Sequence, residues 1–261
     1  MKAHLLIFAA VLLVPCWTMP AGQWKVPSSI PLNMVPDAVD DMYYGCTEKM
    51  ERRVQKEYFR KEFVGTFKIA WENAEKCSNK YSQVLTKNQR QAICVYTSND
   101  IYAEFNKAVR TGRSIYGSSF RFHSLHFWLT TAIQTLNNKH CYISYRRSRA
   151  AFTGNVNSII RFGAFASSSL RTDLKQFGSK TCFQIMTCFG AYVKHYSNYP
   201  SEEEVLIPPY ERFKITKIIN GQGKFPDLSD CEKVFTLRSS VYKSNLNCKA
   251  APRLESSIFS K

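Results

Sequence analysis

Paired carboxylates in residues 201–209 are the feature of this sequence that points most directly to chemistry. The segment reads Ser-Glu-Glu-Glu-Val-Leu-Ile-Pro-Pro. If the backbone is extended here, Glu202 and Glu204 share a face roughly 7 Å apart, and Glu203 points away. The apolar triplet at 205–207 would anchor the strand in a core, and the two prolines would stop further pairing. A solvated acidic turn before an edge strand is the alternative interpretation.

Two further segments carry candidate functional groups. Residues 145–149, Tyr-Arg-Arg-Ser-Arg, place arginines at the end of an expected strand. A guanidinium there could grip a phosphate through a bidentate contact, and a solvated basic loop is the alternative. Residues 161–169 change from an alternating strand into three serines. His195 is the nearby candidate base for a serine nucleophile and no Gly-x-Ser-x-Gly elbow is present, so we interpret these hydroxyls as ligand-positioning groups or a turn.

The charge balance indicates an anionic partner without identifying it. Lys and Arg number 36 against 20 Asp and Glu, which gives a formal net charge of +16. Such a field attracts nucleotides, heparin-like glycans, nucleic acid and anionic membranes alike. The basic residues are spread along the chain without a run of five, so the sequence predicts no dedicated polybasic arm.

Residues 1–22 have the pattern of a secretory signal peptide. Lys2 precedes an apolar run at 5–14, and Ala21 and Gly22 follow. The run is too short to span a bilayer, so we expect cleavage between about residues 18 and 22 and a mature chain of 23–261. An N-terminal membrane anchor is the alternative. No later window predicts a membrane span, and the polar tail at 253–261 carries no lipid-anchor signal.

Cysteine usage agrees with export. Cys16 lies in the leader and leaves an even number of cysteines, typical of a secreted protein with up to four disulfides: Cys46, Cys77, Cys94, Cys141, Cys182, Cys188, Cys231 and Cys248. The mature-chain histidines do not cluster with them at ligand spacing, so we expect no metal site. His123 and His126, three residues apart on an expected helix, are interpreted as packing residues rather than metal ligands.

The hydrophobic pattern changes period near residue 138, which predicts an α+β fold. Helical spacing covers 37–58, 63–76, 101–109 and 122–136, with residues 98–100 as an N-cap cluster for the third helix. Short β-branched or aromatic runs follow at 142–145, 159–167, 182–188, 205–207, 213–219 and 233–238, and Asn220-Gly221 predicts a hairpin turn. We therefore expect a helical part at about 36–138 and a strand-rich part at about 139–250.

Taken together, these motifs resemble the arginine-specific vertebrate ecto-ADP-ribosyltransferases over nearly the whole mature chain. The arginine, the strand ending in serines and the Glu-x-Glu pair occur in the family's order, and further matches lie at 40–46, 92–97, 105–110, 125–127, 161–167 and 195–209. The resemblance implies an ADP-ribosyltransferase fold with a helical N-terminal lobe and a C-terminal β-sandwich around a cleft for NAD. It also implies transfer of ADP-ribose from NAD or NADP to a protein arginine, with release of nicotinamide.

The same resemblance implies a role for each matching residue. Glu204 corresponds to the family's catalytic glutamate, which stabilises the positive charge that develops on the ribose. Glu202 matches the acid that orients the acceptor guanidinium. Arg146 would hold the phosphate and ribose of NAD, and Ser167 would fix the nicotinamide-ribose side. Tyr96 and Ser197 match positions of further NAD contacts.

The resemblance also implies the disulfides Cys46–Cys248 and Cys141–Cys188, and the sequence leaves the pairing of Cys77, Cys94, Cys182 and Cys231 open. Two departures concern NAD affinity. Arg147 stands where the family usually has glycine, and Ala164 where relatives often carry a glutamine that contacts NAD. Arg147 and Arg149 could compensate through the pyrophosphate.

Two alternatives to a transferase remain at this stage. Water could replace the arginine acceptor, which would make the protein an NAD glycohydrolase that uses the same site. A basic secreted binding protein for glycans or other anionic surfaces could retain the fold without turnover. NAD as co-substrate, arginine-containing protein acceptors and an extracellular location are the expected partners and setting. Neither a metal nor nucleic acid is expected.

Overall fold

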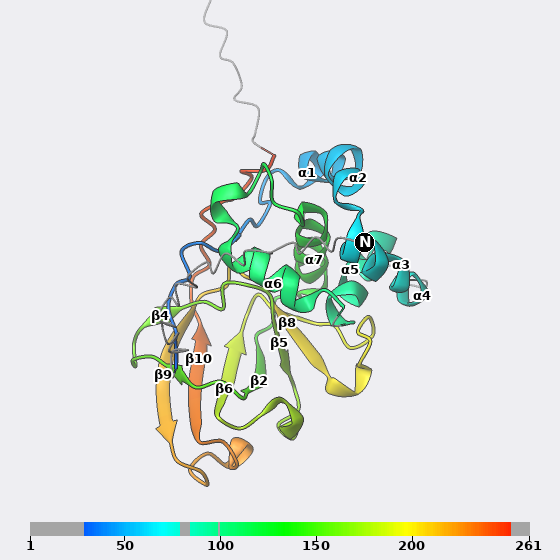
Figure 1. Ribbon diagram of the computed structural model, residues 1–261. Coiled ribbons are helices and arrows are strands. Elements are labelled where there is room, and N and C mark those ends of the chain that lie inside the picture. Colours follow the sequence, from blue (N-terminus) through cyan, green and yellow to red (C-terminus); the bar gives the residue numbers. More distant parts are fainter. Residues whose placement is uncertain (1–28, 79–83, 99, 252–261) are drawn as a thin grey trace, which may run out of the picture.

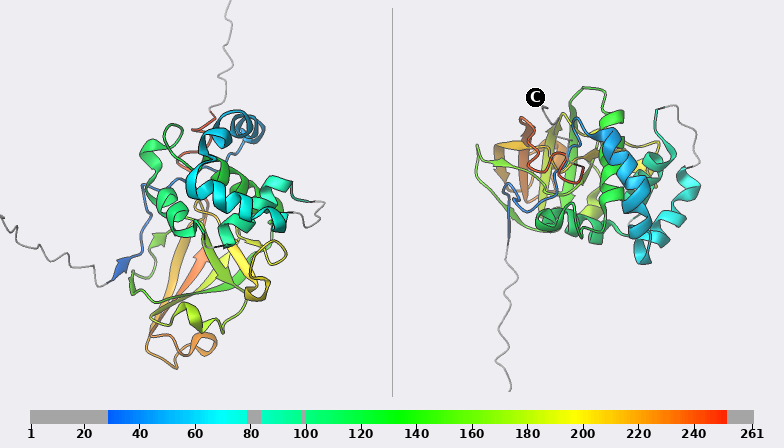
Figure 2. Two further views of the ribbon diagram at one scale, coloured as in Figure 1. Left: turned by 45° about the vertical axis from the view of Figure 1, so that its right-hand side comes forward. Right: turned by 90° about the horizontal axis from the view of Figure 1, so that it is seen from above.

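The computed structural model describes residues 29–78, 84–98 and 100–251. The expected signal peptide at 1–22 and the polar tail at 253–261 lie outside these residues. Figure 1 shows the helices gathered at one end of the molecule and the larger sheet at the other. The left view in Figure 2 shows the same separation. The change of period in the sequence therefore corresponds to a change from helices to strands along the chain.

The helices occupy the chain from Thr47 to Leu136. They are α1 (Thr47–Arg53), a π-helical turn (Val54–Tyr58), α2 (Phe59–Glu62), α3 (Gly65–Asn73), α4 (Glu75–Ser78), α5 (Lys87–Thr97), α6 (Tyr102–Thr111) and α7 (His123–Leu136). The sequence predicted that the first helix would begin at residue 37, but it begins at Thr47. Asp40 and Asp41 lie in the segment before it, fully buried, and accept hydrogen bonds from the C-terminal part of the chain.

Helix α5 was missed by the sequence analysis. A capping box begins it, because the Thr86 hydroxyl accepts from the Gln89 amide and the Gln89 side chain accepts from the Thr86 amide. This Thr-x-x-Gln signal is visible in the sequence. The predicted N-cap at 98–100 was wrong, because Ser98 is the C-cap of α5 and α6 follows Ile101 without a side-chain cap.

The strand-rich part begins at Tyr142. Its strands are β2 (Tyr142–Ser148), β3 (Phe152–Thr153), β4 (Ile159–Ile160), β5 (Ala166–Ser169), β6 (Thr181–Thr187), β7 (Ala191–Tyr192), β8 (Glu204–Ile207), β9 (Phe213–Asn220) and β10 (Lys233–Ser239). A short strand before the helices, β1 (Ile30–Pro31), pairs in parallel with β3. The other eight strands join in the order β4-β9-β10-β6-β2-β5-β8-β7.

These eight strands form one hydrogen-bonded sheet, but the sheet splits between β2 and β5. Its larger part contains β4, β9, β10, β6 and β2, and its smaller part contains β5, β8 and β7. A single register pair, Tyr145 with Ser169, links those strands, whereas β2 and β6 pair along seven residues. The two parts then pack face to face, because Ala166 of β5 and Ile207 of β8 share a core cluster with Phe183 and Phe235 from the other part. A sandwich-like core thus forms within one folded sheet.

Two predicted strand features differ in detail. The expected strand at 159–167 is interrupted, because Arg161 turns inward and donates to Asp40. The hairpin predicted at Asn220-Gly221 is a longer connection, since β9 ends at Asn220 and β10 begins opposite it at Lys233. A short 3₁₀ turn, Pro226–Leu228, lies within this connection.

The helices pack around α7 and onto the smaller part of the sheet. Val193 and Leu206 belong to the same core cluster as Leu129 and Ile133 of α7. Both α7 histidines are packing residues, as expected. His123 hydrogen-bonds Glu62, and burial lowers the pKa of His126 to about 3, so its ring is neutral.

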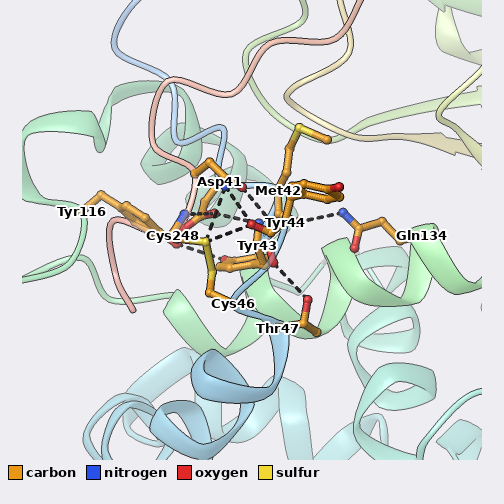
Figure 3. The surroundings of a disulfide bond; sticks show 10 residues. Asp41, Met42, Tyr43, Tyr44, Cys46, Thr47, Tyr116, Gln134 and Cys248 are labelled. Carbon is orange, nitrogen blue, oxygen red and sulfur yellow. Dashed lines mark hydrogen bonds between the residues drawn. A yellow bond between two sulfur atoms is a disulfide. The ribbon is translucent and has the colours of Figure 1, made fainter. Parts of the chain in front are cut away.

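A disulfide joins the two ends of the described chain. Cys46, which precedes α1, is bonded to Cys248, 202 residues later. Figure 3 shows Asp41 beside this bond, where it accepts from the Cys248 amide and from the Tyr116 hydroxyl. Burial raises the pKa of Asp41 to about 6. In the chain-entropy model a link across so long a loop contributes about 5 kcal/mol to folding.

Further disulfides lie in the strand-rich part. Cys141 and Cys188, the second pair expected from the resemblance, are bonded. Cys182 of β6 bonds Cys231 in the β9–β10 connection, which the sequence had left open. Cys94 is also disulfide-bonded.

Candidate active site

Three neighbouring strands bring the candidate catalytic residues together. Arg146 lies on β2, Ser167 on β5 and Glu204 on β8. In register, Tyr145 is opposite Ser169, and Ser169 is opposite Glu204. The site therefore forms at the point where the sheet divides.

A cavity of about 470 Å³ opens over these strands. Helices α5 and α6 contribute Tyr96, Thr97 and Tyr102 to its wall, and the loop after β5 contributes Arg171, Leu174 and Phe177. The sheet and the turn before β8 supply the remaining lining residues: Tyr145, Arg146, Arg147, Ser148, Arg149, Ala150, Ser167, Ser168, Ser169, Tyr199, Glu202 and Glu204. Cations and carboxylates thus face one volume that is large enough for a small molecule.

Glu204 is the most perturbed acid of the site. Glu204 is the first residue of β8. The next three residues, Val205, Leu206 and Ile207, are fully buried, as the sequence predicted. Glu204 itself is 5% exposed, and burial raises its pKa to about 7. Hydrogen bonds from Ser167 and Ser197 oppose this effect, and the Ser197 hydroxyl lies 3.2 Å from Oε2. Glu204 can therefore change its charge near neutral pH.

Glu202 reaches the cavity by a different local structure from the one predicted. It ends a 3₁₀ turn, Pro200–Glu202, and Glu203 then adopts a left-handed conformation with φ 49° before β8 begins. The extended backbone predicted for 202–204 was wrong at its first two residues. Glu203 nevertheless lies away from the cavity and pairs with Lys194 at 3.0 Å. Glu202 is partly exposed, and burial raises its pKa.

The acidic turn is held by the end of β5. The Ser169 hydroxyl donates to the Glu202 carbonyl, and the Leu170 amide donates to the Glu203 carbonyl. Arg171 donates to the Ser201 carbonyl at 2.9 Å. These contacts fix the carboxylates relative to the serine strand.

Arg146 is oriented by the same strand. Its Nη1 donates to the Ser167 carbonyl at 2.5 Å. Burial raises the pKa of Tyr102, but the Arg146 guanidinium outweighs this effect and leaves that pKa below its ordinary value. The guanidinium is thus held beside a phenol at the cavity wall.

Known proteins are similar to this chain in sequence and architecture. A family model described as NAD:arginine ADP-ribosyltransferase matches residues 32–230. The chicken erythroblast NAD(P)(+)--arginine ADP-ribosyltransferase is 35% identical over 84% of this chain and 75% of its own length. Rat T-cell ecto-ADP-ribosyltransferase 1 is 36% identical over 83% of this chain and 79% of its own.

The chain belongs to the NAD:arginine ADP-ribosyltransferase family.

A solved ADP-ribosyltransferase gives the same result for the fold. A mutant of the eucaryotic mono-ADP-ribosyltransferase ART2.2, crystallised in complex with NADH, superimposes with a TM-score of 0.72 at 33% identity. The match covers 84% of this chain and 98% of that one. The α+β fold expected from the resemblance is therefore confirmed.

Tyr96 and Ser197, the two further residues of the present chain that were expected to contact NAD, lie in different positions relative to the cavity. Tyr96 lines the cavity, and its hydroxyl donates to the Phe165 carbonyl at 3.0 Å. Ser197 is 1% exposed and lies outside the group of lining residues, where its hydroxyl donates to Glu204 and accepts from the Tyr199 amide. It therefore contacts the candidate catalytic residue Glu204 rather than the cavity.

The departures from the ADP-ribosyltransferase pattern are accommodated structurally. Arg147 forms a bidentate ion pair with Asp230, at 2.8 and 2.9 Å, and donates to the Thr172 carbonyl. Its guanidinium is thus already engaged, so the expected compensation through the pyrophosphate is not available to it. Arg149 donates to the Gln176 carbonyl and stays exposed at the cavity. Ala164 is fully buried in the core.

Sequence reasoning missed cavity residues that this ADP-ribosyltransferase takes from loops and helix ends. Tyr102, Phe177 and Tyr199 line the cavity, and the last two are 46% and 44% exposed. Tyr102 could have been predicted as a cavity residue, because it begins a helix that follows Tyr96 closely in the sequence. Within residues 29–78, 84–98 and 100–251, no three His, Cys, Asp or Glu side chains gather as metal ligands.

Proposed function

We propose that the cavity binds NAD between β2, β5 and β8 and that Glu204 is the catalytic carboxylate of ADP-ribose transfer to arginine. The observation that carries this proposal is the meeting of Arg146, Ser167, Glu202 and Glu204 at one cavity in a member of this family. Arg146 pairs with the NAD phosphate, because a guanidinium matches two phosphate oxygens. Ser167 lies on the nicotinamide-ribose side.

Glu204 acts on the ribose as the nicotinamide bond breaks. Loss of nicotinamide builds positive charge on the ribose, as in other oxocarbenium-like transition states. An ionised carboxylate in a buried site stabilises that charge strongly, because few water molecules screen it. Glu204 also accepts a hydrogen bond from the ribose 2′-hydroxyl. Its ionised form is the active one.

Glu202 orients the acceptor. Its partial exposure lets a protein arginine reach it from outside, whereas Glu204 is deeper. A carboxylate and a guanidinium form a charge-assisted hydrogen bond, which aims the arginine nitrogen at the ribose. The exposed ring of Tyr199, three residues before Glu202, also lines the cavity and restricts how the acceptor enters.

The products and setting follow from the family. The protein transfers ADP-ribose from NAD, its co-substrate, to arginine side chains of proteins and releases nicotinamide. It works outside the cell or at its surface, as the named ecto-enzymes among its relatives do. Among the helices that the structure describes, none has the length and apolar character that a membrane crossing requires. The finer proposal is secretion after removal of residues 1–22.

The test is nicotinamide release from NAD by purified, disulfide-intact protein, with and without a simple guanidino acceptor. We expect acceptor-dependent release, lost in Glu204→Ala and retained in Glu203→Gln, whose side chain pairs with Lys194 away from the cavity. Folded wild-type protein that is inert under both conditions would refute the proposal and favour the binding-protein alternative.

Glu202→Gln separates transfer from hydrolysis. Both reactions need Glu204, but water does not need a carboxylate to orient a guanidinium. We expect the variant to lose transfer to the acceptor while it keeps acceptor-independent nicotinamide release. An equal loss of both reactions would contradict the role assigned to Glu202.

A further inference from the structure

The larger part of the sheet has an outer face opposite its core. Side chains alternate along a strand, and Phe213, Ile215, Phe235 and Leu237 of β9 and β10 point into the core between the two parts of the sheet. The intervening residues of these strands therefore project outward. Helices pack instead against the smaller part of the sheet, through Val193 and Leu206 among others.

Three cations occupy this outer surface. Lys214 and Lys217 of β9 and Arg238 of β10 are exposed, and we call them the basic face. Lys214 is the direct register partner of Arg238. A β-bulge interrupts the alternation after Ile215 and places Lys217 opposite Thr236, on the outer face. Directly opposite side chains have Cβ atoms about 4.5–5.5 Å apart, a spacing at which like charges repel. An anion between them would remove that repulsion.

Neighbouring carboxylates do not neutralise the basic face. The five strands β4, β9, β10, β6 and β2 contain no Asp or Glu. The acids of the β9–β10 connection already have partners. Asp227 accepts from the Tyr145 hydroxyl, Asp230 pairs with Arg147, and Glu232 pairs with Lys180. No ion pair of the basic face occurs among the described residues.

We propose that the basic face binds a sulfated polysaccharide. At about 3.3 Å per residue the backbone positions of Lys214 and Lys217 are roughly 10 Å apart along β9, with Arg238 beside them, which suits a linear polyanion carrying repeated charges. The protein works outside the cell, whereas anionic lipid is concentrated in the cytoplasmic leaflet. Single-stranded nucleic acid needs aromatic stacking platforms, but the register neighbours of these cations are Ile159, Thr236 and Met186.

Strand β6 separates the basic face on β9 and β10 from β2, the nearest strand that lines the reactive cavity. Arg146 is opposite Phe183, which lies in the core between the two parts of the sheet, so the Arg146 side chain leaves β2 on the inner side. Ile143 lies three residues earlier, on the outer face, and is the register partner of Met186. A glycan chain could hold the protein in the matrix while the cavity stays open to NAD.

The experiment compares two triple variants of the full mature chain that lose the same charge. The face variant carries Lys214→Gln, Lys217→Gln and Arg238→Gln. A matched control carries Lys56→Gln, Arg60→Gln and Lys107→Gln, which are also exposed cations and lie in the helical part. Affinity for heparin is measured as a function of salt, and nicotinamide release and the thermal midpoint report that each variant is folded.

Each ionic contact releases bound counterions, so the logarithm of the binding constant falls linearly with the logarithm of the salt concentration. Loss of three contacts should reduce the steepness of that line by about two to three. We expect this decrease in the face variant and a much smaller change in the control, with nicotinamide release unchanged in both. Equal decreases in the two variants would mean diffuse attraction and would overturn the proposal. Face-dependent binding to phosphatidylserine vesicles or to oligonucleotides, with no such dependence for heparin, would overturn it in favour of those ligands.

Discussion

Replacing Glu204 by Gln should abolish nicotinamide release and yet stabilise the folded protein at neutral and alkaline pH. Glu204 is 5% exposed, and burial raises its pKa from the ordinary 4.5 to about 7. In the unfolded chain the same carboxyl ionises near its ordinary value. Between these two values the native state therefore binds more protons than the unfolded state, and the free energy of unfolding falls as pH rises.

The size of this effect follows from the two pKa values. One pKa unit corresponds to 1.36 kcal/mol, so the ionised Glu204 costs the wild type about 3 kcal/mol above pH 7. Gln has nearly the same shape, carries no charge, and can accept the hydrogen bond that Ser197 donates to Oε2. The variant should equal the wild type near pH 4, gain stability between about pH 4.5 and 7, and keep a constant advantage above that range.

The assay is urea unfolding of both proteins from pH 4 to pH 9 with the disulfides intact. Asp41 and Glu211 also have pKa values raised by burial, but they are present in both proteins and cancel in the difference. Glu203→Gln is the matched control. It loses only a partly exposed pair with Lys194, whose two side chains are each 36% exposed, and should change stability by less than about 1 kcal/mol. A stability difference between wild type and Glu204→Gln that does not vary with pH would refute the reasoning.

Two other predictions concern residues around the same cavity. Arg147→Ala should lower the free energy of unfolding by about 2 kcal/mol, because it breaks a bidentate pair with Asp230, and should leave the KM for NAD unchanged. Urea unfolding and steady-state kinetics check this, and a raised KM with unchanged stability would make Arg147 an NAD ligand instead. Ser197→Ala should shift the acidic limb of the nicotinamide-release profile to higher pH, because it removes a hydrogen bond that lowers the pKa of Glu204. An unshifted limb would contradict the positioning role of Ser197.

Local sequence signals located most of the helices and strands, but they placed the ends of fewer of them correctly. The 3.6-residue period at 122–136 gave helix α7 almost to the residue, and the apolar triplet at 205–207 gave the buried body of β8. Helix α5 escaped notice although its capping box is local. The strand expected at 159–167 failed for a tertiary reason, because Arg161 breaks the alternation to reach Asp40, 121 residues earlier.

The acidic segment shows the same limit within the site. The residue types left a paired-carboxylate site and a solvated acidic turn both open, and the family resemblance implied that Glu202 and Glu204 share a function. Only the fold shows that Glu202 reaches the cavity from a 3₁₀ turn, with Glu203 in a left-handed conformation. Contacts from Ser169 and Leu170 on β5 hold that turn. No local propensity encodes contacts made by another strand.

The sequence by itself determined the family, the order of helices before strands and the residue types that carry the chemistry, because motif order and hydrophobic period are properties of the chain. The tertiary structure decided which groups meet and with what charge. The raised pKa of Glu204 results from burial among β5, β8 and the helices, and the engagement of Arg147 results from Asp230, 83 residues later. Both effects depend on distances through space, and a linear pattern does not contain them.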